Sequence, residues 1–241
     1  MCTASWLPGA DGYFLCFNRD ESRSRLPGRP PSQVTANGLR VVAPSDGNHG
    51  GSWIGANEAG LTVAVANRYQ VPRPPVPVDR ISRGLLVMEM LGQGSMRDLE
   101  RALSSRRLEQ YEPFTLLGLE RGAPAHLWSW DGDSLAAWRQ EAPGLLLASS
   151  AADQDAAASA RRDTFTQAAA LGPLDPKALA AIHASHRPVR GPLSVCMHRE
   201  DASTVSFTMV TAGRGRISLA HANGPPCVTP LAPPLSLDTR G

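Results

Sequence analysis

Short apolar runs with alternating polarity dominate the first third of the chain, and this pattern predicts β-strands. Residues 2–7 and 13–18 form two such runs on either side of a turn-forming segment, 8–12, so we predict a hairpin at the amino terminus. A basic, proline-containing loop is predicted over 19–31. Three more strands are predicted at 39–43, 52–56 and 61–67, the last two joined by the turn sequence Asn57-Glu58-Ala59-Gly60.

Helical periodicity appears next, after a proline-rich segment, 71–78, that predicts an extended surface loop. A helix is predicted over 79–92, and a second helix opens at Ser95 and places Leu99 and Leu103 on one face together with Met96. Strands are then predicted at 114–119, 126–130, 134–138 and 145–149.

A second helical block follows these strands. Residues 153–170 are rich in alanine and predict one helix. Asp175 and Pro176 form a capping residue followed by proline at the first helical position, so a further helix is predicted to about residue 186. The chain closes with predicted strands at 194–198, 205–211 and 216–221 and a proline-rich tail.

The order of these elements is strands, two helices, strands, two helices and strands. Hairpin-linked strands with helices segregated in this way favour an α+β fold of layered antiparallel sheets over a doubly wound sheet. The connections are too short to separate domains, so we expect one domain over residues 1–241.

Composition and charge exclude several classes of function. The 241 residues are 42% hydrophobic and 19% charged with a net charge of +2, so no dense basic face for nucleic acid is expected. No apolar run is long enough to span a membrane, and the amino terminus lacks the features of a secretory signal. We therefore expect a cytoplasmic protein; the sequence carries no signal for its oligomeric state.

The cysteines and histidines give little support for a metal centre. The four cysteines lie far apart without a C-x-x-C pair, so free thiols are expected at Cys2, Cys16, Cys196 and Cys227, the last two as buried or incidental thiols. His183 and His186 could share a metal ion, but no third ligand stands at a suitable spacing and a polar helix end is favoured. No metal site and no cofactor are predicted, and nucleotide-binding and zinc-protease motifs are absent from the sequence.

Cys2 has an unusual position, because a small second residue allows an aminopeptidase to remove Met1. Cys2 would then carry both a thiol, with a pKa of about 8.5, and an α-amine, with a pKa of about 7.7–8.0. The amine can accept the thiol proton and later return a proton to a leaving amine. A terminal cysteine therefore combines a nucleophile and its base in one residue.

Arg19 and Asp20 follow the second strand of the predicted hairpin. The hairpin brings both residues within side-chain reach of Cys2, where a cation suits the thiolate and a carboxylate suits the ammonium. Taken without Cys2, the sequence Asn18-Arg19-Asp20-Glu21 is more simply a salt bridge at the end of a strand.

A family resemblance rests on four stretches of sequence: Met-Cys-Thr, CFNRDE, HGGSWIGANEAGLTVAVAN and ISRGLL. With these stretches the chain resembles the NRDE-motif family, also called the transport and Golgi organisation 2 family. That family is related in pattern to amino-terminal-nucleophile (Ntn) hydrolases such as choloylglycine hydrolase and penicillin V acylase. The resemblance covers residues 2–86 well. It implies a four-layer αββα sandwich of antiparallel sheets and a cofactor-free amidohydrolase that attacks a linear amide C–N bond of a small molecule.

The resemblance also implies roles for four residues. Cys2 corresponds to the nucleophile, Arg19 to the arginine that stabilises the thiolate, and Asn67 to a donor for the oxyanion. Asp20 departs from the hydrolase pattern, because it adjoins Arg19 and neighbouring strand residues point in opposite directions unless the strand bulges. A second departure is Ser149, which stands where a second oxyanion asparagine is expected.

The resemblance leaves an alternative function open, because family members are linked to the handling of haem or lipid-like ligands. The protein would then be a binding or trafficking protein without turnover, and a Cys2 thiolate could be an axial haem ligand.

Two further segments also have two interpretations each. Residues 50–55, GGSWIG, are either a backbone nest beside a substrate or a tight entry to a strand with Trp53 in the core. Arg23, Arg25 and Arg29 either attract an anionic substrate or form a solvated loop, which is favoured.

Overall fold

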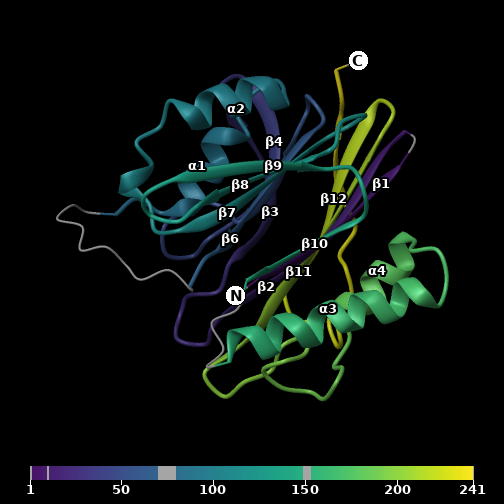
Figure 1. Cartoon of the computed structure of the whole chain (residues 1–241). Coiled ribbons are helices and arrows are strands. Elements are labelled where there is room, and N and C mark those ends of the chain that lie inside the picture. The colour runs from purple at the N-terminus through teal and green to yellow at the C-terminus, as the bar shows by residue number, and fades with distance from the viewer. Residues whose placement is uncertain (1, 10, 70–79, 149–152, 241) are drawn as a thin grey trace.

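A computed structural model describes residues 2–9, 11–69, 80–148 and 153–240, and within them two antiparallel sheets face each other (Figure 1). The first sheet contains, in spatial order, β10 (Gly144–Ala148), β1 (Cys2–Gly9), β2 (Gly12–Ser22), β11 (Ala202–Gly213), β12 (Arg216–Ala222) and β13 (Leu235–Asp238). The second sheet follows chain order and contains β3 (Arg29–Ala36), β4 (Leu39–Ser45), β5 (Ile54–Asn57), β6 (Leu61–Asn67), β7 (Phe114–Glu120), β8 (Ala125–Trp130) and β9 (Leu135–Gln140).

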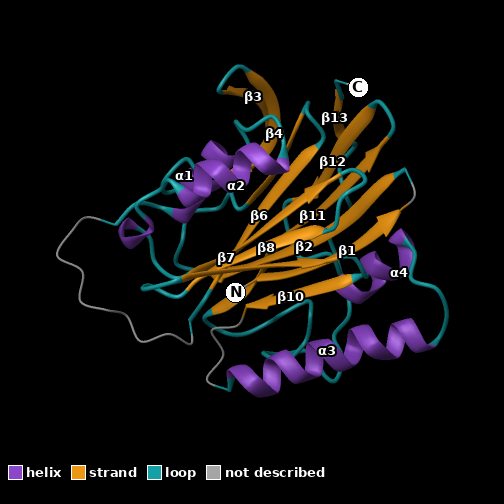
Figure 2. Cartoon of the chain, turned by 45° about the horizontal axis from the view of Figure 1, so that its top comes forward, coloured by secondary structure: helices purple, strands orange, loops and turns teal. Residues whose placement is uncertain are grey.

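Helices cover the outer face of each sheet (Figures 1 and 2). The seven-stranded sheet contacts α1 (Arg83–Met90) and α2 (Met96–Ser104), and the six-stranded sheet contacts α3 (Gln154–Ala170) and α4 (Pro176–His183). A short 3₁₀ turn, Leu108–Gln110, leads into β7. The layers thus run helix, sheet, sheet, helix, and the predicted α+β, four-layer αββα sandwich is confirmed. No helix among the described residues has the length and apolar character that a membrane crossing requires.

Local sequence signals explain where three of these helices begin. The side chain of Ser95 accepts a hydrogen bond from the backbone of Asp98 at the start of α2. Asp153 caps α3 in the same way, and Asp175 caps α4 with Pro176 at the first helical position. Such caps satisfy backbone N–H groups that have no partner within the helix.

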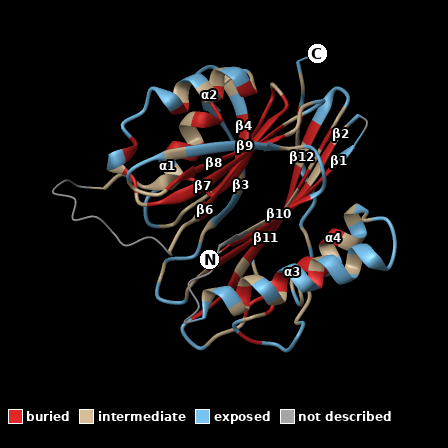
Figure 3. Cartoon of the chain, in the orientation of Figure 1, coloured by how far each residue is buried: buried red, intermediate tan, exposed pale blue. Residues whose placement is uncertain are grey.

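The main hydrophobic core lies between the two sheets (Figure 3). Trp6, Leu15 and Phe17 from the first sheet are buried there, as is Ile54 from the second, and the cluster continues through the second sheet to Leu86 of α1 and Leu99 of α2. A smaller cluster packs the outer face of the first sheet against α4 and includes Cys16, Leu179, Ile182 and Phe207. The central strands are therefore covered on both faces, which explains why β1 and β6 consist almost entirely of buried residues.

The structure corrects three predictions made from the pattern. The loop predicted at 19–31 is confined to residues 23–28, because β2 continues to Ser22 and β3 begins at Arg29. The strand predicted at 194–198 is absent, and only an isolated bridge joins His198 to Ser203. A short strand, β13, lies within the proline-rich tail. The predicted loop 71–78 lies outside the described residues.

The strand residues that the sequence missed share a physical cause, which is pairing with a distant strand or at a sheet edge. β2 continues because β11, from the far end of the chain, hydrogen-bonds along its whole length. β3 and β13 are edge strands, where an exposed and proline-containing sequence is tolerated. Neither property can be recognised from local alternation.

Candidate active site

Cys2 is the first residue of β1, which lies between β10 and β2 in the six-stranded sheet. Its register partners are Arg19 on β2 and Ala148 on β10. The side chain is buried, with 7% of the residue exposed, and it lines a cavity of about 270 Å³. Arg19, Asp20 and Asn67 line the same cavity, so the structure brings together all four site residues that the sequence singled out.

The Arg19 guanidinium is held on three sides. Its Nη2 lies 2.7 Å from an oxygen of Asp46 and 3.3 Å from one of Glu21. The guanidinium carbon lies 4.2 Å from the centre of a Trp53 ring, which is a cation–π contact. Arg19 thus brings a fixed positive charge to the strand position directly opposite Cys2.

The Asp20 carboxylate is fully buried and turns toward a different set of partners. One oxygen accepts a hydrogen bond of 2.6 Å from the Thr204 hydroxyl, and the other lies 3.4 Å from Nη1 of Arg161 on α3. The pairing of β2 with β11 shifts by one residue at this point, because Val205 bulges between the partners of Asp20 and Arg19. Arg19 and Asp20 therefore bind different groups, as adjacent strand residues should, and still line one cavity.

Asn67 ends β6, in the opposite sheet, and its amide nitrogen donates a 2.7 Å hydrogen bond to the Tyr69 hydroxyl. Burial raises the pKa of Tyr69, with a further contribution from the nearby Cys2 thiol and an opposing one from the Asn67 hydrogen bond. Asn67 thus lines the cavity that also contains Cys2, and Tyr69 lies near enough to Cys2 for the thiolate charge to act on its hydroxyl.

Charged residues of both signs complete the cavity wall. The arginines are Arg19, Arg25, Arg80 and Arg83, and the acids are Asp20, Glu21, Asp46 and Glu112. Arg25 pairs with Asp46 at 3.0 Å, and Arg80 pairs with Glu112. Burial acts to raise the pKa of Asp46, but amide hydrogen bonds from His49 and Asn48 and the charges of Arg25 and Arg19 outweigh it, so this pKa is lowered. Of the three loop arginines predicted, only Arg25 lines this cavity.

The GGSWIG segment supports the site through close packing. A side chain at Gly51 would place its Cβ 2.3 Å from the backbone of Gly84, in the first turn of α1. Ser52 donates a backbone hydrogen bond of 3.0 Å to the carbonyl of Gly84. Trp53 is buried beneath Arg19 and also approaches His221. The segment is therefore a tight strand entry whose residues at the same time form part of the cavity wall.

The Cys2 thiol is electrostatically unfavourable to ionise in this structure. Burial raises its pKa above the usual value, and the charges of Asp20 and Glu21 add to this, whereas Arg19 acts in the opposite direction. A thiol in such a position needs a proton acceptor close by to become a nucleophile.

Arg161 and Thr204 form the part of the site that the sequence did not predict. Both come from the last third of the chain and bind Asp20. One signal for Arg161 is present in the sequence, because it shares the buried face of the alanine-rich helix with Ala157 and Thr164. An arginine on the buried face of a helix is rare unless its charge is paired with a carboxylate. Ser149, the predicted substitute for a second oxyanion asparagine, lies outside the described residues.

Comparisons with known proteins agree with this geometry. The family described as transport and Golgi organisation 2 matches residues 1–156, which is more than half of the chain. The chain belongs to this family. The transport and Golgi organisation 2 match covers β1 through β10 and ends just inside α3, so the strands that complete the six-stranded sheet lie beyond it. The family resemblance noted in the sequence is confirmed. No curated protein matches the sequence significantly.

Solved structures of Ntn hydrolases share the fold of this transport and Golgi organisation 2 protein. A Caenorhabditis elegans orthologue of N-acylethanolamine-hydrolyzing acid amidase matches 87% of this chain and 92% of its own with a TM-score of 0.57 and 14% identity. A mutant conjugated bile acid hydrolase from Clostridium perfringens matches 99% of this chain and 92% of its own, with a TM-score of 0.54 and 12% identity. Penicillin V acylase from Agrobacterium tumefaciens matches 93% of this chain and 84% of its own, with a TM-score of 0.53 and 11% identity. At these identities the similarity establishes the fold.

Proposed function

We propose that this protein is an Ntn amidohydrolase that cleaves a linear amide C–N bond of a small molecule, with Cys2 as nucleophile once Met1 has been removed. One observation carries the proposal: the Cys2 side chain lines a cavity together with Arg19, Asp20 and Asn67, on a fold shared with amide hydrolases. The activities of those hydrolases belong to those proteins and serve here as support for the class of reaction.

The first half of the reaction forms an acyl-enzyme. The free α-amine of Cys2 accepts the thiol proton, and the sulfur then attacks the amide carbonyl carbon. The resulting oxyanion would accept a hydrogen bond from the amide of Asn67, which lines the same cavity. The C–N bond breaks, the leaving nitrogen takes the proton from the Cys2 ammonium, and a thioester remains on sulfur.

The second half of the reaction regenerates the enzyme. The α-amine takes a proton from a water molecule, whose oxygen attacks the thioester carbonyl. The C–S bond breaks, the acid leaves, and the proton returns to sulfur, so the cycle consumes only water and the amide. No external redox partner or cofactor enters this balance.

The residues around Cys2 can be given distinct parts in this scheme. Arg19, the register partner of Cys2, would stabilise the thiolate, and Asp20, which lines the same cavity, would act on the ammonium through its negative charge. Nδ2 of Asn67 carries two hydrogens, of which one is donated to Tyr69 and the other would serve the oxyanion. A well-placed donor of this kind lowers a barrier by about 3–4 kcal/mol.

Haem binding, the alternative raised by the family resemblance, fits the cavity poorly. A porphyrin needs a flat apolar slot, whereas four arginines and four acids line this cavity and its volume of about 270 Å³ is small. We therefore assign no step to haem.

A thiol-directed acyl probe and a panel of N-acyl amides test the proposal. Intact mass of the purified protein should be short by one methionine, and the probe should acylate Cys2 stoichiometrically. Hydrolysis should rise with pH through the α-amine pKa of about 7.7–8.0. Cys2→Ala should reduce turnover to background, because removal of the nucleophile costs about six orders of magnitude in comparable hydrolases.

Cys16→Ala is the matched control, because Cys16 is equally buried but packs on the opposite face of the sheet, against α4. It should keep both acylation and turnover. The proposal fails if processed wild-type protein neither reacts with the probe nor hydrolyses any amide in the panel. It also fails if Cys2→Ala retains wild-type turnover.

A further inference from the structure

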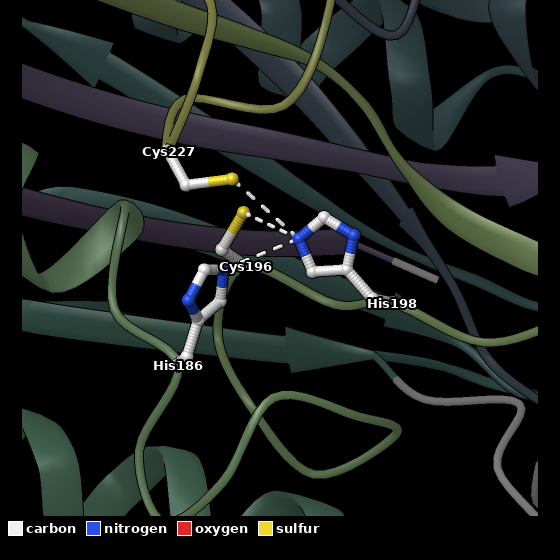
Figure 4. A group of neighbouring side chains, drawn as sticks. All are labelled: His186, Cys196, His198 and Cys227. Carbon is white, nitrogen blue, oxygen red and sulfur yellow. Dashed lines mark hydrogen bonds between the residues drawn. The ribbon is translucent and has the colours of Figure 1, made fainter.

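A second cluster of reactive side chains lies near the six-stranded sheet, outside the site of Cys2. His186 follows α4, Cys196 and His198 lie in the segment before β11, and Cys227 follows β12 (Figure 4). One donor atom from each of the four residues lies within 4.8 Å of every other. Three separate segments of the chain therefore converge on one point.

The spacing of these atoms matches an empty tetrahedral metal site. The two histidine Nε2 atoms lie 3.2 Å apart, and the sulfurs of Cys196 and Cys227 each lie 3.5 Å from Nε2 of His198. A tetrahedral Zn²⁺ with Zn–N near 2.05 Å and Zn–S near 2.3 Å separates two nitrogens by about 3.4 Å and a nitrogen from a sulfur by about 3.6 Å. Small outward movements of the side chains would admit the ion.

We propose that His186, Cys196, His198 and Cys227 bind a structural Zn²⁺ ion. Two thiolates and two imidazoles are the donor set that selects zinc over magnesium or calcium, which prefer oxygen ligands. Four protein ligands fill the tetrahedron, so no position remains for substrate or water. The ion would therefore stabilise the fold and take no part in catalysis.

Simpler explanations account for only part of the cluster. A disulfide between Cys196 and Cys227 would explain the two sulfurs, but it would leave two histidines brought together by their Nε2 atoms without a reason. His183, which was considered from the sequence but not favoured as a metal partner of His186, has its Nε2 2.8 Å from the Ser5 hydroxyl. The partners of His186 come from residues 196–227, and this explains why no metal motif was visible in the sequence.

The backbone holds the ligands in place without a metal. Cys196 donates a backbone hydrogen bond of 3.0 Å to Ser185, the neighbour of His186, and His198 donates one of 3.2 Å to Gly191. The Ser194 hydroxyl bonds the carbonyl of Cys196 at 2.7 Å. Such preorganisation outside the ligand shell is typical of a metal site.

The site would connect with the Cys2 cavity through the segment between Cys196 and His198. Met197 donates its backbone N–H to the Thr204 hydroxyl at 2.8 Å, and this hydroxyl in turn binds Asp20 at 2.6 Å. Zinc would therefore fix the loop that orients Thr204. The zinc proposal stands on its own geometry and does not depend on the amidase proposal.

Cobalt substitution tests the site directly on the full-length protein. Reduced, metal-stripped protein should bind one equivalent of Co²⁺ and develop the intense visible bands of tetrahedral cobalt together with thiolate-to-cobalt charge transfer. Added Zn²⁺ should bleach both signals and raise Tm. Protein grown with zinc should carry about one zinc per chain by elemental analysis.

Single substitutions identify the ligands. Cys196→Ser, Cys227→Ser and His198→Asn should each lower Co²⁺ affinity at least tenfold, on the scale reported for altered metal environments. Arg190→Ala is the matched control, because Nη2 of Arg190 lies 3.4 Å from Nδ1 of His198 but cannot bind a cation. It should bind cobalt fully, as should Cys2→Ala.

Three results would overturn the proposal. The first is reduced wild-type protein that develops no tetrahedral cobalt spectrum. The second is a spectrum that survives all three ligand substitutions. The third is a spectrum abolished by Cys2→Ala but kept by Cys227→Ser, which would assign the metal to the other cavity.

Discussion

At the scale of single residues, the buried pair of Arg161 and Asp20 is the feature on which the site depends most. Both side chains are almost completely inaccessible to solvent, and Arg161 also donates to the Thr3 hydroxyl at 3.0 Å. Taking one member of such a pair away leaves a charge in a medium of low dielectric constant, which costs about 3–5 kcal/mol. Arg161 therefore links α3 to β2 through Asp20 and to β1, which carries Cys2, through Thr3.

Arg161→Met should lower the free energy of unfolding by about 3–5 kcal/mol, because the Asp20 carboxylate loses its buried cation. The double variant Asp20→Asn, Arg161→Met should be less destabilised than Arg161→Met alone, since it no longer buries an uncompensated charge. Urea denaturation measures both. Arg162→Met, an exposed neighbour on the same helix, is the control. If Arg161→Met and Arg162→Met lose the same free energy of unfolding, the Arg161–Asp20 pair does not stabilise the fold in this way.

The sequence alone identified the residues near Cys2 because a hairpin dictates them. Register in a tight hairpin places Arg19 opposite Cys2 with no further information. Asn67 could be placed only through the family resemblance. Arg161 and Thr204 reach Asp20 from more than 140 positions away, and no local pattern encodes which distant side chain will neutralise a buried carboxylate.

At the scale of elements, the approach of α1 to the GGSWIG segment positions one wall of the cavity. Gly51 and Gly84 allow the two backbones to touch, and Ser52 bonds across the contact. The first turn of α1 also supplies Ser82, Arg83 and Gly84 to the cavity. A change in this contact should therefore alter both stability and the shape of the site.

Gly51→Ala should destabilise the protein by about 1–3 kcal/mol, because its Cβ would meet the Gly84 backbone at 2.3 Å and the chain must move apart. Acylation of Cys2 by the probe should slow at the same time. Gly213→Ala is the control, since a Cβ there meets no atom within 4 Å. If Gly51→Ala unfolds at the same urea concentration as Gly213→Ala, the contact is not tight.

Elements were predicted well wherever a periodic pattern and a cap or turn coincided. Residues 61–67 match β6 at both ends, and the caps at Ser95 and Asp175 mark the true helix starts. The edge strands β3 and β13 were missed, because neither alternates between buried and exposed positions. Element boundaries that depend on the partner strand, such as the end of β2, were also missed.

At the scale of the whole molecule, two buried histidines make the fold sensitive to acid. Burial lowers the pKa of His183 to about 3, with a further contribution from the charge of Arg161, and burial lowers that of His221 to about 4. The unfolded chain binds protons to both histidines near pH 6.5. Below that pH the unfolded state therefore binds more protons than the folded state, and stability falls as the pH falls.

His183→Gln should reduce the slope of the free energy of unfolding against pH by about 1.4 kcal/mol per pH unit between about pH 6 and pH 5. This is the amount that one titrating group contributes. Glutamine can still hydrogen-bond the Ser5 hydroxyl but does not titrate in this range. Urea denaturation at several pH values measures the slope, and the value at pH 8 separates lost packing from lost titration. An unchanged acid slope in the variant would show that His183 is protonated in the folded state.

The place of β1 between β2 and the late strand β10 has a consequence for the order of events during synthesis. Cys2 is made almost first, but its neighbour β10 and the residues that bind Asp20 are made much later, ending with Thr204. At about 5–20 residues per second, roughly 10–40 s pass before Thr204 is added. During that interval the amino terminus is open to an aminopeptidase, whereas in the finished fold Cys2 is buried. Under the proposed function, Met1 is therefore expected to be removed on the ribosome, and a chain that escapes removal would lack the free α-amine of Cys2 after folding.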